Sequence, residues 1–370
     1  MILTNLALTN FKNIAEANLD FSPKINCFLG NNGMGKSNLL DAVYFLSFTK
    51  SFCRLPEAML IRRGEDFSII NGHYIRNGAD EDLSVGLRRG SRKTFRRGGK
   101  DYKRISSHIG LFPAVMVAPA DQSLVTESAE ERRRFIDMII SQADAPYLEA
   151  LMRYNQALEQ RNRLLRDGVV DPTLFESLEM MMSMNASLIQ SRRSQHVARL
   201  AEIFGRYYRE IAGDDEPVGL EYVQSGGGHD SLQEALDHSR GRDQILKFTT
   251  VGPHRDDIAF TLSGMPVKQT ASQGQTKTFT IALRFAQYEF LRQATGQSPL
   301  LLLDDIFDKL DARRVERIMD IVRKDEFGQI FITDTNRKHL DEIIALSGSD
   351  YRLWHVKDGA FSPVTADETL

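Results

Sequence analysis

One segment of the sequence, residues 30–37, has the spacing G-x-x-x-x-G-K-S, and this segment restricts the fold more than any other feature. It follows a short apolar stretch, residues 25–29, that is typical of a buried strand, and helical spacing begins directly after it. Glycines in a strand–loop–helix unit let backbone N–H groups approach phosphate oxygens, while Lys36 reaches the β- and γ-phosphates and Ser37 can bind Mg²⁺. The alternative, a glycine-rich turn with an exposed lysine, is disfavoured by the flanking strand and helix.

This loop predicts that ATP and Mg²⁺ are the cofactors. The loop residues expected to contact the nucleotide are Gly30, Asn31, Asn32, Gly33, Met34, Gly35, Lys36, Ser37 and Asn38.

The two cysteines, Cys27 and Cys53, have no metal-ligand spacing, and no secretion signal or run of 18 apolar residues occurs. We therefore expect a reduced, cytoplasmic protein without a membrane span.

A second motif consists of four leucines, residues 300–303, followed by Asp304 and Asp305. Such an apolar run suits a strand buried in a parallel sheet, with Asp304 positioned to hold Mg²⁺ and Asp305 to orient an attacking water. Alone, the run fits a core strand that ends in a helix cap equally well, but beside the loop it favours catalysis. The predicted catalytic residues are Lys36, Asp304 and Asp305, and the predicted metal ligands are Ser37 and Asp304.

A third segment, residues 271–275, precedes a predicted helix and resembles the signature motif of the ABC ATPases. In that superfamily a serine and a helix start bind the γ-phosphate held by a second subunit, which is anion binding at a helix N-terminus. The resemblance implies nucleotide contacts from Ser272, Gln273, Gly274 and Gln275. It also implies contacts from Asp311, in a segment like the D-loop (residues 308–311), and from Thr333, although the sequence does not choose between Thr333 and Thr335.

The remaining pattern indicates an α/β head interrupted by helices. Residues 67–104 read as an antiparallel meander with turns at Asn77-Gly78, Gly90 and Gly98-Gly99. Residues 130–141, 146–166 and 172–211 have helical spacing, prolines mark the starts of the last two segments, and Asp167-Gly168 is expected to be the turn between these two antiparallel helices. Residues 225–228 read as a flexible connection. We therefore predict an ABC-type ATPase head with a mixed sheet and a β meander at residues 1–125 and 246–370, and an inserted helical arm at residues 126–245.

Across nearly its full length the chain resembles the RecF family. The motifs that carry the resemblance are residues 8–13, 30–38, 50–54, 131–137, 161–165, 252–257, 272–275 and 303–305. The run Gly-Pro-His-Arg-Asp-Asp at 252–257 and the glutamine inside the signature are distinctive of that family.

This resemblance implies an ATP-dependent homodimer with two composite sites that binds duplex or gapped DNA. It further implies that the protein promotes RecA loading with RecO and RecR, and that Lys12 contacts the nucleotide. Two departures occur. Residues 118–122 differ from the family's serine-proline-glutamate-aspartate segment, and this difference leaves the role of Asp121 or Gln122 open. Asp305 replaces a catalytic glutamate, which predicts slow turnover. A structural ATPase of the Rad50 and SMC kind is disfavoured by the short arm, and a transporter ATPase subunit by the basic meander.

The meander carries a cluster of basic residues although the net charge of the chain is −3. The residues predicted to bind DNA phosphates are Arg88, Arg89, Arg92, Lys93, Arg96, Arg97 and Lys100. The alternative is a solvated, charged hairpin. A second basic run, Arg132, Arg133 and Arg134, either extends this surface or forms ion pairs along its helix with Glu130 and Glu131. Residues 254–256 are expected to form a turn network.

Overall fold

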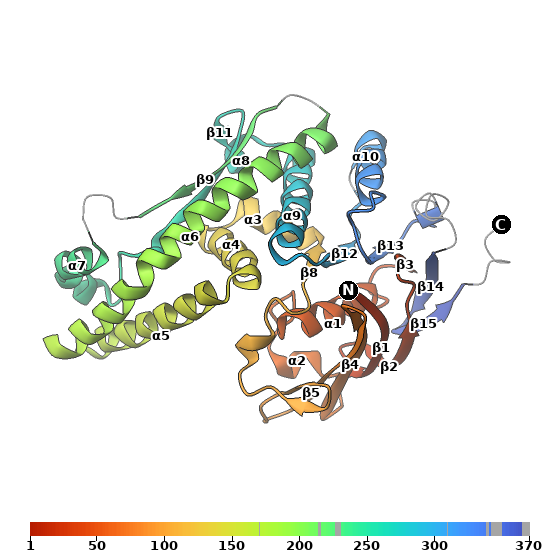
Figure 1. The fold of residues 1–370 in the computed structure, drawn as a ribbon, viewed down its shortest axis with the longest axis horizontal. Coiled ribbons are helices and arrows are strands. Elements are labelled where there is room, and N and C mark those ends of the chain that lie inside the picture. The colour runs from red at the N-terminus through yellow and green to blue at the C-terminus, as the bar shows by residue number, and fades with distance from the viewer. Residues whose placement is uncertain are drawn as a thin grey trace. The chain divides into compact units, whose positions relative to one another are not determined.

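The computed structural model describes residues 1–169, 171–213, 216–225, 231–308, 310–337, 340–341 and 350–364. The chain forms two compact units, one from Met1–Asp121 and Gln287–Leu370 and the other from Gln122–Ala286 (Figure 1). The second unit begins close to the predicted arm but also takes in residues 246–286, because strands on either side of residue 245 pair within it. The glycine run 226–228, predicted to be a flexible connection, lies outside the described residues.

The first unit contains a mixed, six-stranded sheet in the order β15-β14-β3-β13-β12-β8. Four of its strands are β8 (Ala114–Val117), β3 (Ile25–Leu29), β12 (Leu300–Asp304) and β13 (Ile330–Asp334). These strands and β14 (Tyr351–Lys357) are parallel, while β15 (Ala360–Pro363) pairs antiparallel with β14. Strands β8, β12 and β13 are buried along their length, which explains why they appear in the sequence as apolar runs without alternation.

A second, antiparallel sheet of the same unit has the order β2-β1-β4-β5-β6-β7. Its strands are β1 (Ile2–Phe11), β2 (Ile14–Asp20), β4 (Phe67–Arg76), β5 (Ala79–Arg88), β6 (Thr94–Arg97) and β7 (Lys100–Asp101). The predicted meander at residues 67–104 is confirmed. Asn77 and Gly78 both have positive φ angles of 52° and 77°, as a two-residue hairpin turn between β4 and β5 requires.

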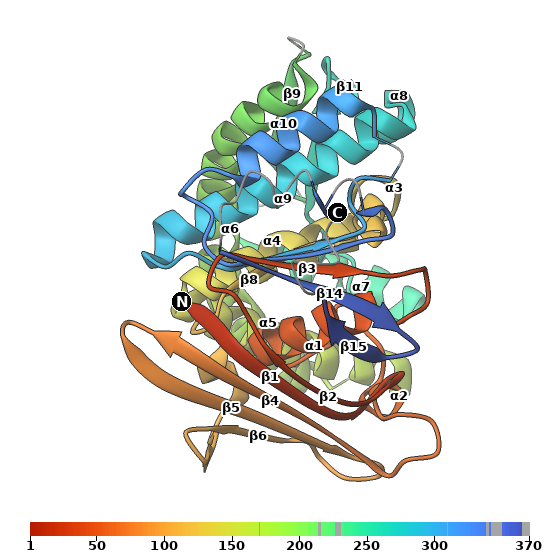
Figure 2. The same ribbon diagram turned by 90° about the vertical axis from the view of Figure 1, so that its right-hand side faces the viewer.

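Helix α1 (Lys36–Phe48) contacts strands of both sheets, and Figure 2 shows it between them. All of its residues from 39 to 48 are buried, so the helix is covered on every side, unlike a surface helix with one apolar face. This unit also contains the short helices α2 (Glu57–Leu60) and η1 (Ile105–His108) and the longer helix α10 (Ala312–Val322).

The second unit is built on a helical hairpin of α5 (Ala145–Asp167) and α6 (Pro172–Ala212). Asp144 and Asp171 cap the two helices at their starts, prolines occupy their first turns, and Gly168 ends α5 with φ 71°. The other elements are η2 (Pro119–Gln122) at the boundary, and α3 (Ser123–Thr126), α4 (Ala129–Ala143), β9 (Val218–Val223), α7 (Leu232–Leu246), η3 (Pro253–Arg255), β10 (Asp257–Leu262), β11 (Met265–Pro266) and α8 (Val267–Thr270). Helix α9 (Gln273–Thr295) starts in this unit.

Candidate nucleotide site, signature motif and basic surface

The glycine-rich loop joins β3 to α1 at the carboxyl edge of the parallel sheet. Gly35 has φ 115° and occupies the N-cap position of α1, a conformation that side chains rarely adopt. At Gly30 a Cβ atom would lie 2.3 Å from the carbonyl oxygen of Val356 on β14. Glycine is therefore required at both positions by this backbone path, and the sequence pattern and the geometry agree.

Lys36 is buried at the start of α1 and is held by the loop itself. Its Nζ donates hydrogen bonds to the carbonyl oxygens of Gly30, at 2.5 Å, and Asn31, at 2.9 Å. Burial lowers the pKa of Lys36, and the nearby carboxylates of Asp305, Asp304 and Asp334 oppose that shift. A phosphate offers the ammonium group a charged acceptor in place of these two carbonyls.

Asp304, at the end of β12, accepts two hydrogen bonds at one carboxylate oxygen. Ser37 Oγ donates to Asp304 Oδ1 at 2.8 Å, and Thr333 Oγ1 donates to the same oxygen at 2.7 Å. Burial raises the pKa of Asp304, although the two hydroxyl donors counter part of the shift. Hydroxyl and carboxylate oxygens are ligands that suit Mg²⁺, and a buried carboxylate gains from a cation, so these residues fit the metal.

Asp305 follows in a left-handed conformation with φ 48°, and its backbone N–H donates to the carbonyl oxygen of Thr333 at 3.2 Å. Burial and the neighbouring Asp334 raise the pKa of its carboxyl group. A cavity of about 140 Å³ is lined by both acidic residues and by the loop, namely Asn32, Gly33, Gly35, Lys36, Ser37, Asn38, Asp304 and Asp305. The structure therefore brings all three predicted catalytic residues to one cavity.

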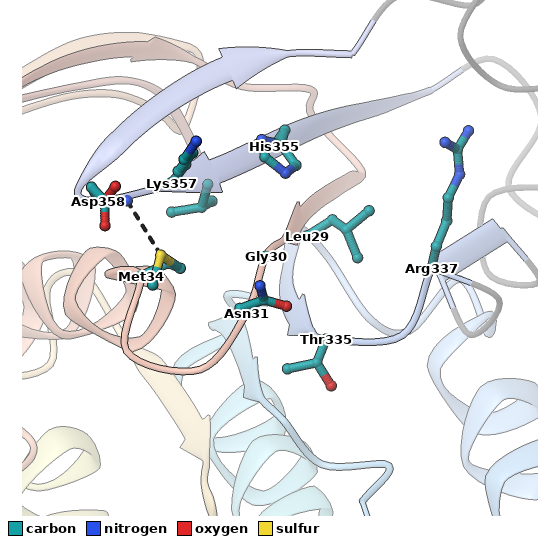
Figure 3. A pocket seen from close by; sticks show the side chains of 10 residues that line it. Leu29, Gly30, Asn31, Met34, Thr335, Arg337, His355, Lys357 and Asp358 are labelled. Carbon is teal, nitrogen blue, oxygen red and sulfur yellow. Dashed lines mark hydrogen bonds between the residues drawn. The ribbon is translucent and has the colours of Figure 1, made fainter.

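Two threonines lie near the end of β13, Thr333 within the strand and Thr335 directly after it, and their environments differ. Thr333 is fully buried beneath Asp304, whereas Thr335 lines a second cavity of about 420 Å³ (Figure 3). Gly30, Asn31 and Met34 of the loop line that cavity too, as do Arg337, His355 and Lys357. Thr335, not Thr333, therefore shares a cavity with the glycine-rich loop.

Lys12 is anchored by a residue that the sequence analysis did not single out. Its Nζ lies 2.6 Å from Asp41 Oδ2, and the same buried carboxylate accepts from Ser51 Oγ at 2.7 Å and Phe52 N at 2.6 Å. Asp41 thus ties the β1–β2 turn and residues 51–52 to α1. A carboxylate on the apolar face of a predicted helix was the signal that could have identified it.

The same turn also reaches the glycine-rich loop. Asn38 Nδ2 donates to Asn13 Oδ1 at 2.8 Å, and a Cβ atom at Gly35 would lie 3.0 Å from the Asn13 side chain.

The signature-like segment, in the second unit, forms a reciprocal cap at the start of α9. Gln275 N donates to Ser272 Oγ at 3.2 Å, and Ser272 N donates to Gln275 Oε1 at 2.9 Å. Ser272 and Gln273 are exposed, and Gly274 is half-buried. Because Ser272 Oγ only accepts in this cap, its own proton stays available, beside the unpaired N–H groups of a helix start.

Asp311, predicted to contact the nucleotide, caps α10, where its carboxylate accepts from Arg314 N at 2.9 Å. Lys309, in the same D-loop-like segment, lies outside the described residues. Asp121 is buried in η2 and accepts from the backbone N–H of Ala118 at 2.9 Å, which is a local structural role.

The residues at 254–256 form the expected turn network. His254 Nε2 faces the Thr249 carbonyl, which can only accept, so Nε2 carries the proton and Nδ1 accepts from Tyr154 Oη at 2.7 Å. Asp256 is buried and accepts from Ser225 N at 2.8 Å.

The arginine triplet has mixed partners. Arg132 binds Asp257 with two hydrogen bonds, at 2.9 and 3.0 Å, and Arg133 donates to the carbonyl oxygen of Asp256 at 2.6 Å. Of the three arginines, Arg134 alone shows the expected ion pairs with Glu130 and Glu131 along α4.

The predicted DNA-binding residues do not share one face of the meander. Arg96 lies opposite Ser84 and Arg97 opposite Leu83, so their side chains point to opposite faces of the sheet. Arg97 pairs with Glu81 on the face that contains the buried Leu83, while Arg96 pairs with Asp101, at 3.0 Å, on the open face.

The basic residues of the meander also differ in whether they are neutralised. Lys93 pairs with Glu57 at 2.6 Å, and Arg89 donates to the carbonyl oxygens of Glu65 and Ala58. Arg88, Arg92 and Lys100 are exposed and, in the part of the chain that the structure describes, have no ion pair. We call these three residues the free basic group.

The two sheets, the glycine-rich loop followed by α1, and the acidic end of β12 define an ABC-type ATPase head that carries an inserted helical arm. The family model described as "RecF/RecN/SMC N terminal domain" matches residues 2–352. The chain is 48% identical to the DNA replication and repair protein RecF of Parabacteroides distasonis, over 98% of this chain and 100% of that protein. It is 48% identical to the same protein of Bacteroides thetaiotaomicron, over the full length of both. The chain therefore belongs to the RecF family of DNA replication and repair proteins.

Solved structures agree with this assignment. A structure titled as the recombination mediator protein RecF-ATPrS in the RecFOR pathway superposes with a TM-score of 0.86, at 27% identity and 98% coverage of both chains. The head domain of an Smc protein from Pyrococcus furiosus gives a TM-score of 0.58 at 16% identity, which supports the fold alone. No helix in the described ranges is long and apolar enough to cross a membrane.

Proposed function

We propose that this protein is an ATP-dependent DNA-binding protein of recombinational repair and replication-fork maintenance. Its relatives are described as DNA replication and repair proteins, and the solved structures that it resembles are titled as recombination mediators of the RecFOR pathway. In this proposal it binds duplex or gapped DNA and, with RecO and RecR, promotes loading of RecA.

The observation that carries the ATPase part of the proposal is the convergence of Lys36, Ser37 and Asp304. Ser37 Oγ and Asp304 Oδ1 are 2.8 Å apart, at the edge of the cavity that Lys36 also lines. Ser37 Oγ and Asp304 Oδ1 would hold Mg²⁺, which would supply positive charge to the phosphates of the nucleotide. Asp305 lines the same cavity and orients the attacking water. Because its side chain is shorter than that of glutamate, hydrolysis of ATP is slow, and DNA binding stimulates the hydrolysis.

ATP acts as a switch in this proposal because each chain supplies only half of a γ-phosphate site. The loop of one copy holds the triphosphate, and Ser272 of a second copy donates its free hydroxyl proton to the γ-phosphate, with the unpaired N–H groups at the start of α9 beside it. Hydrolysis removes the shared contact and lets the two copies separate. The homodimer is therefore ATP-dependent.

Duplex DNA binds through the meander of the first unit. The free basic group offers three exposed cations to phosphates, and such contacts carry no sequence preference. The residues that are already paired, Lys93, Arg96 and Arg97, contribute less, because a phosphate must displace a carboxylate from each.

Sedimentation of the wild-type protein with and without ATP and duplex DNA tests the switch. We expect dimers only with ATP, and monomers under all conditions for Ser272→Arg, whose bulky side chain blocks the approach of a phosphate. Lys36→Arg serves as the second variant and should lose hydrolysis. Wild-type protein that stays monomeric with ATP, or a Lys36→Arg protein with normal hydrolysis, would show that the proposed site is wrong.

A further inference from the structure

The carboxylate of Glu216 lies between two elements of the second unit and serves a different partner with each oxygen. Tyr208 Oη, near the end of α6, donates to Oε2 at 3.0 Å. Gln275 Nε2, in the first turn of α9, donates to Oε1 at 2.8 Å. Glu216 thereby connects the long helix of the arm to the signature-like segment.

Gln275 hydrogen-bonds to both Glu216 and Ser272 and so links these two residues. Its amide nitrogen faces Glu216 because a carboxylate can only accept hydrogen bonds. The amide oxygen is consequently turned toward Ser272 N, at 2.9 Å, and this contact is one half of the reciprocal cap. Without Glu216 the amide can rotate away, so the cap loses the partner that fixes its orientation.

Tyr208 is held in place by the packing of its ring as well as by its hydroxyl group. Tyr208 is 1% exposed, and its ring lies 6.2 Å from the ring of Phe279 on α9. Loss of the hydroxyl group alone therefore removes the link to Glu216 and leaves the packing of α6 in place.

We infer that Glu216 is a positioning residue for Ser272 and that it couples the orientation of Ser272 to helix α6. The inference rests on the proposed function, in which Ser272 binds the γ-phosphate held by a second copy of the chain. A Ser272 side chain that is fixed in advance loses less freedom when it meets the phosphate, which strengthens the dimer. A displacement of α6 moves Tyr208, loosens Glu216 and weakens the same contact.

Three variants separate the parts of this connection. Glu216→Ala removes both hydrogen bonds, Tyr208→Phe removes only the bond to the arm, and Glu216→Gln keeps an oxygen that can accept from Gln275. The dissociation constant of the ATP-dependent dimer, measured by sedimentation, should rise about tenfold for Glu216→Ala, because the side chains of Gln275 and Ser272 must then be ordered on dimerisation at both composite sites. We expect a smaller rise for Tyr208→Phe and recovery of most of the affinity for Glu216→Gln.

The control measurement is the affinity of the dilute, monomeric protein for a fluorescent ATP analogue, because this affinity reports on the glycine-rich loop alone. This affinity should be unchanged in all three variants. The inference is overturned if Glu216→Ala and Tyr208→Phe dimerise like wild type while Ser272→Arg does not, a result that leaves the proposed function standing. It is also overturned if Glu216→Ala weakens the binding of the analogue as much as it weakens the dimer, since that indicates general damage. Absence of ATP-dependent dimers in wild type contradicts the proposed function itself.

Discussion

Thr333 and Asp304 are register partners on adjacent parallel strands, and the threonine hydroxyl donates to the aspartate carboxylate at 2.7 Å. This hydrogen bond and the one from Ser37 converge on a single oxygen of Asp304, so the carboxylate is held in one orientation. Because Thr333 is fully buried, we expect it to act on the nucleotide through Asp304, and Thr335 to be the hydroxyl nearer the phosphates.

The first prediction concerns Thr333→Val, which keeps the side-chain shape and removes the donor to Asp304. The rate of ATP hydrolysis at saturating Mg²⁺ should fall about tenfold, since the loss of a hydrogen bond to a charged group is on the order of 1.5 kcal/mol. Thr333→Ser is the control, because it keeps the hydroxyl and should retain most of the activity. A Thr333→Val protein as active as wild type would show that Asp304 needs no partner on β13.

The second prediction concerns the free basic group. Replacing Arg88, Arg92 and Lys100 together by alanine should weaken binding to duplex DNA and reduce the slope of log affinity against log salt by about three, because each lost phosphate contact removes about 0.9. The double variant Arg96→Ala and Arg97→Ala is the control, since both side chains are already ion-paired. Equal slopes for the triple variant and wild type would indicate a merely solvated surface.

The third prediction is an acid sensitivity of the first unit that comes from His108. This side chain is fully buried, where Nε2 donates to the Leu46 carbonyl at 2.7 Å and Nδ1 accepts from Tyr102 Oη at 2.9 Å. Burial lowers the pKa of His108 to about 4. Since the unfolded histidine binds its proton near pH 6.5, the folded form is favoured above that pH, and stability is lost as pH falls toward 4.

The chain's single tryptophan, Trp354 on β14, makes this loss measurable. Its fluorescence during urea unfolding reports on the first unit. Between pH 7 and pH 4 the free energy of unfolding should fall by up to about 3 kcal/mol more in wild type than in His108→Gln, which cannot be protonated. The same pH profile in both proteins would assign the acid sensitivity to other groups.

The fourth prediction concerns Arg161 in the arm, which is fully buried and pairs with the equally buried Glu179, at 2.9 Å, and Asp243, at 2.8 Å. Arg161→Met leaves the buried carboxylate of Asp243 without its cation, whereas Glu179 keeps Arg240, and we expect the change to destabilise the second unit by about 3–5 kcal/mol. Thermal unfolding followed by far-UV circular dichroism measures the change. The control is Arg153→Ala, which breaks an exposed pair with Glu149 and should cost less than about 1 kcal/mol.

Signals carried by neighbouring residues were enough to predict much of this protein. The sequence alone determined the glycine-rich loop with its strand and helix, the acidic end of β12, the turn at Asn77 and the capped hairpin of α5 and α6. These features depend on contiguous residues, because backbone conformation, helix capping and strand burial are set over short distances along the chain.

Contacts between distant residues were decided only by the tertiary structure. It added β2 to the meander, buried α1 on every side and gave Asp41 its three partners. It also divided the basic cluster, because the register that sends Arg96 and Arg97 to opposite faces exists only once β5 and β6 pair. Such pairings depend on which segments the fold brings together, and one sequence read in order carries no signal for them.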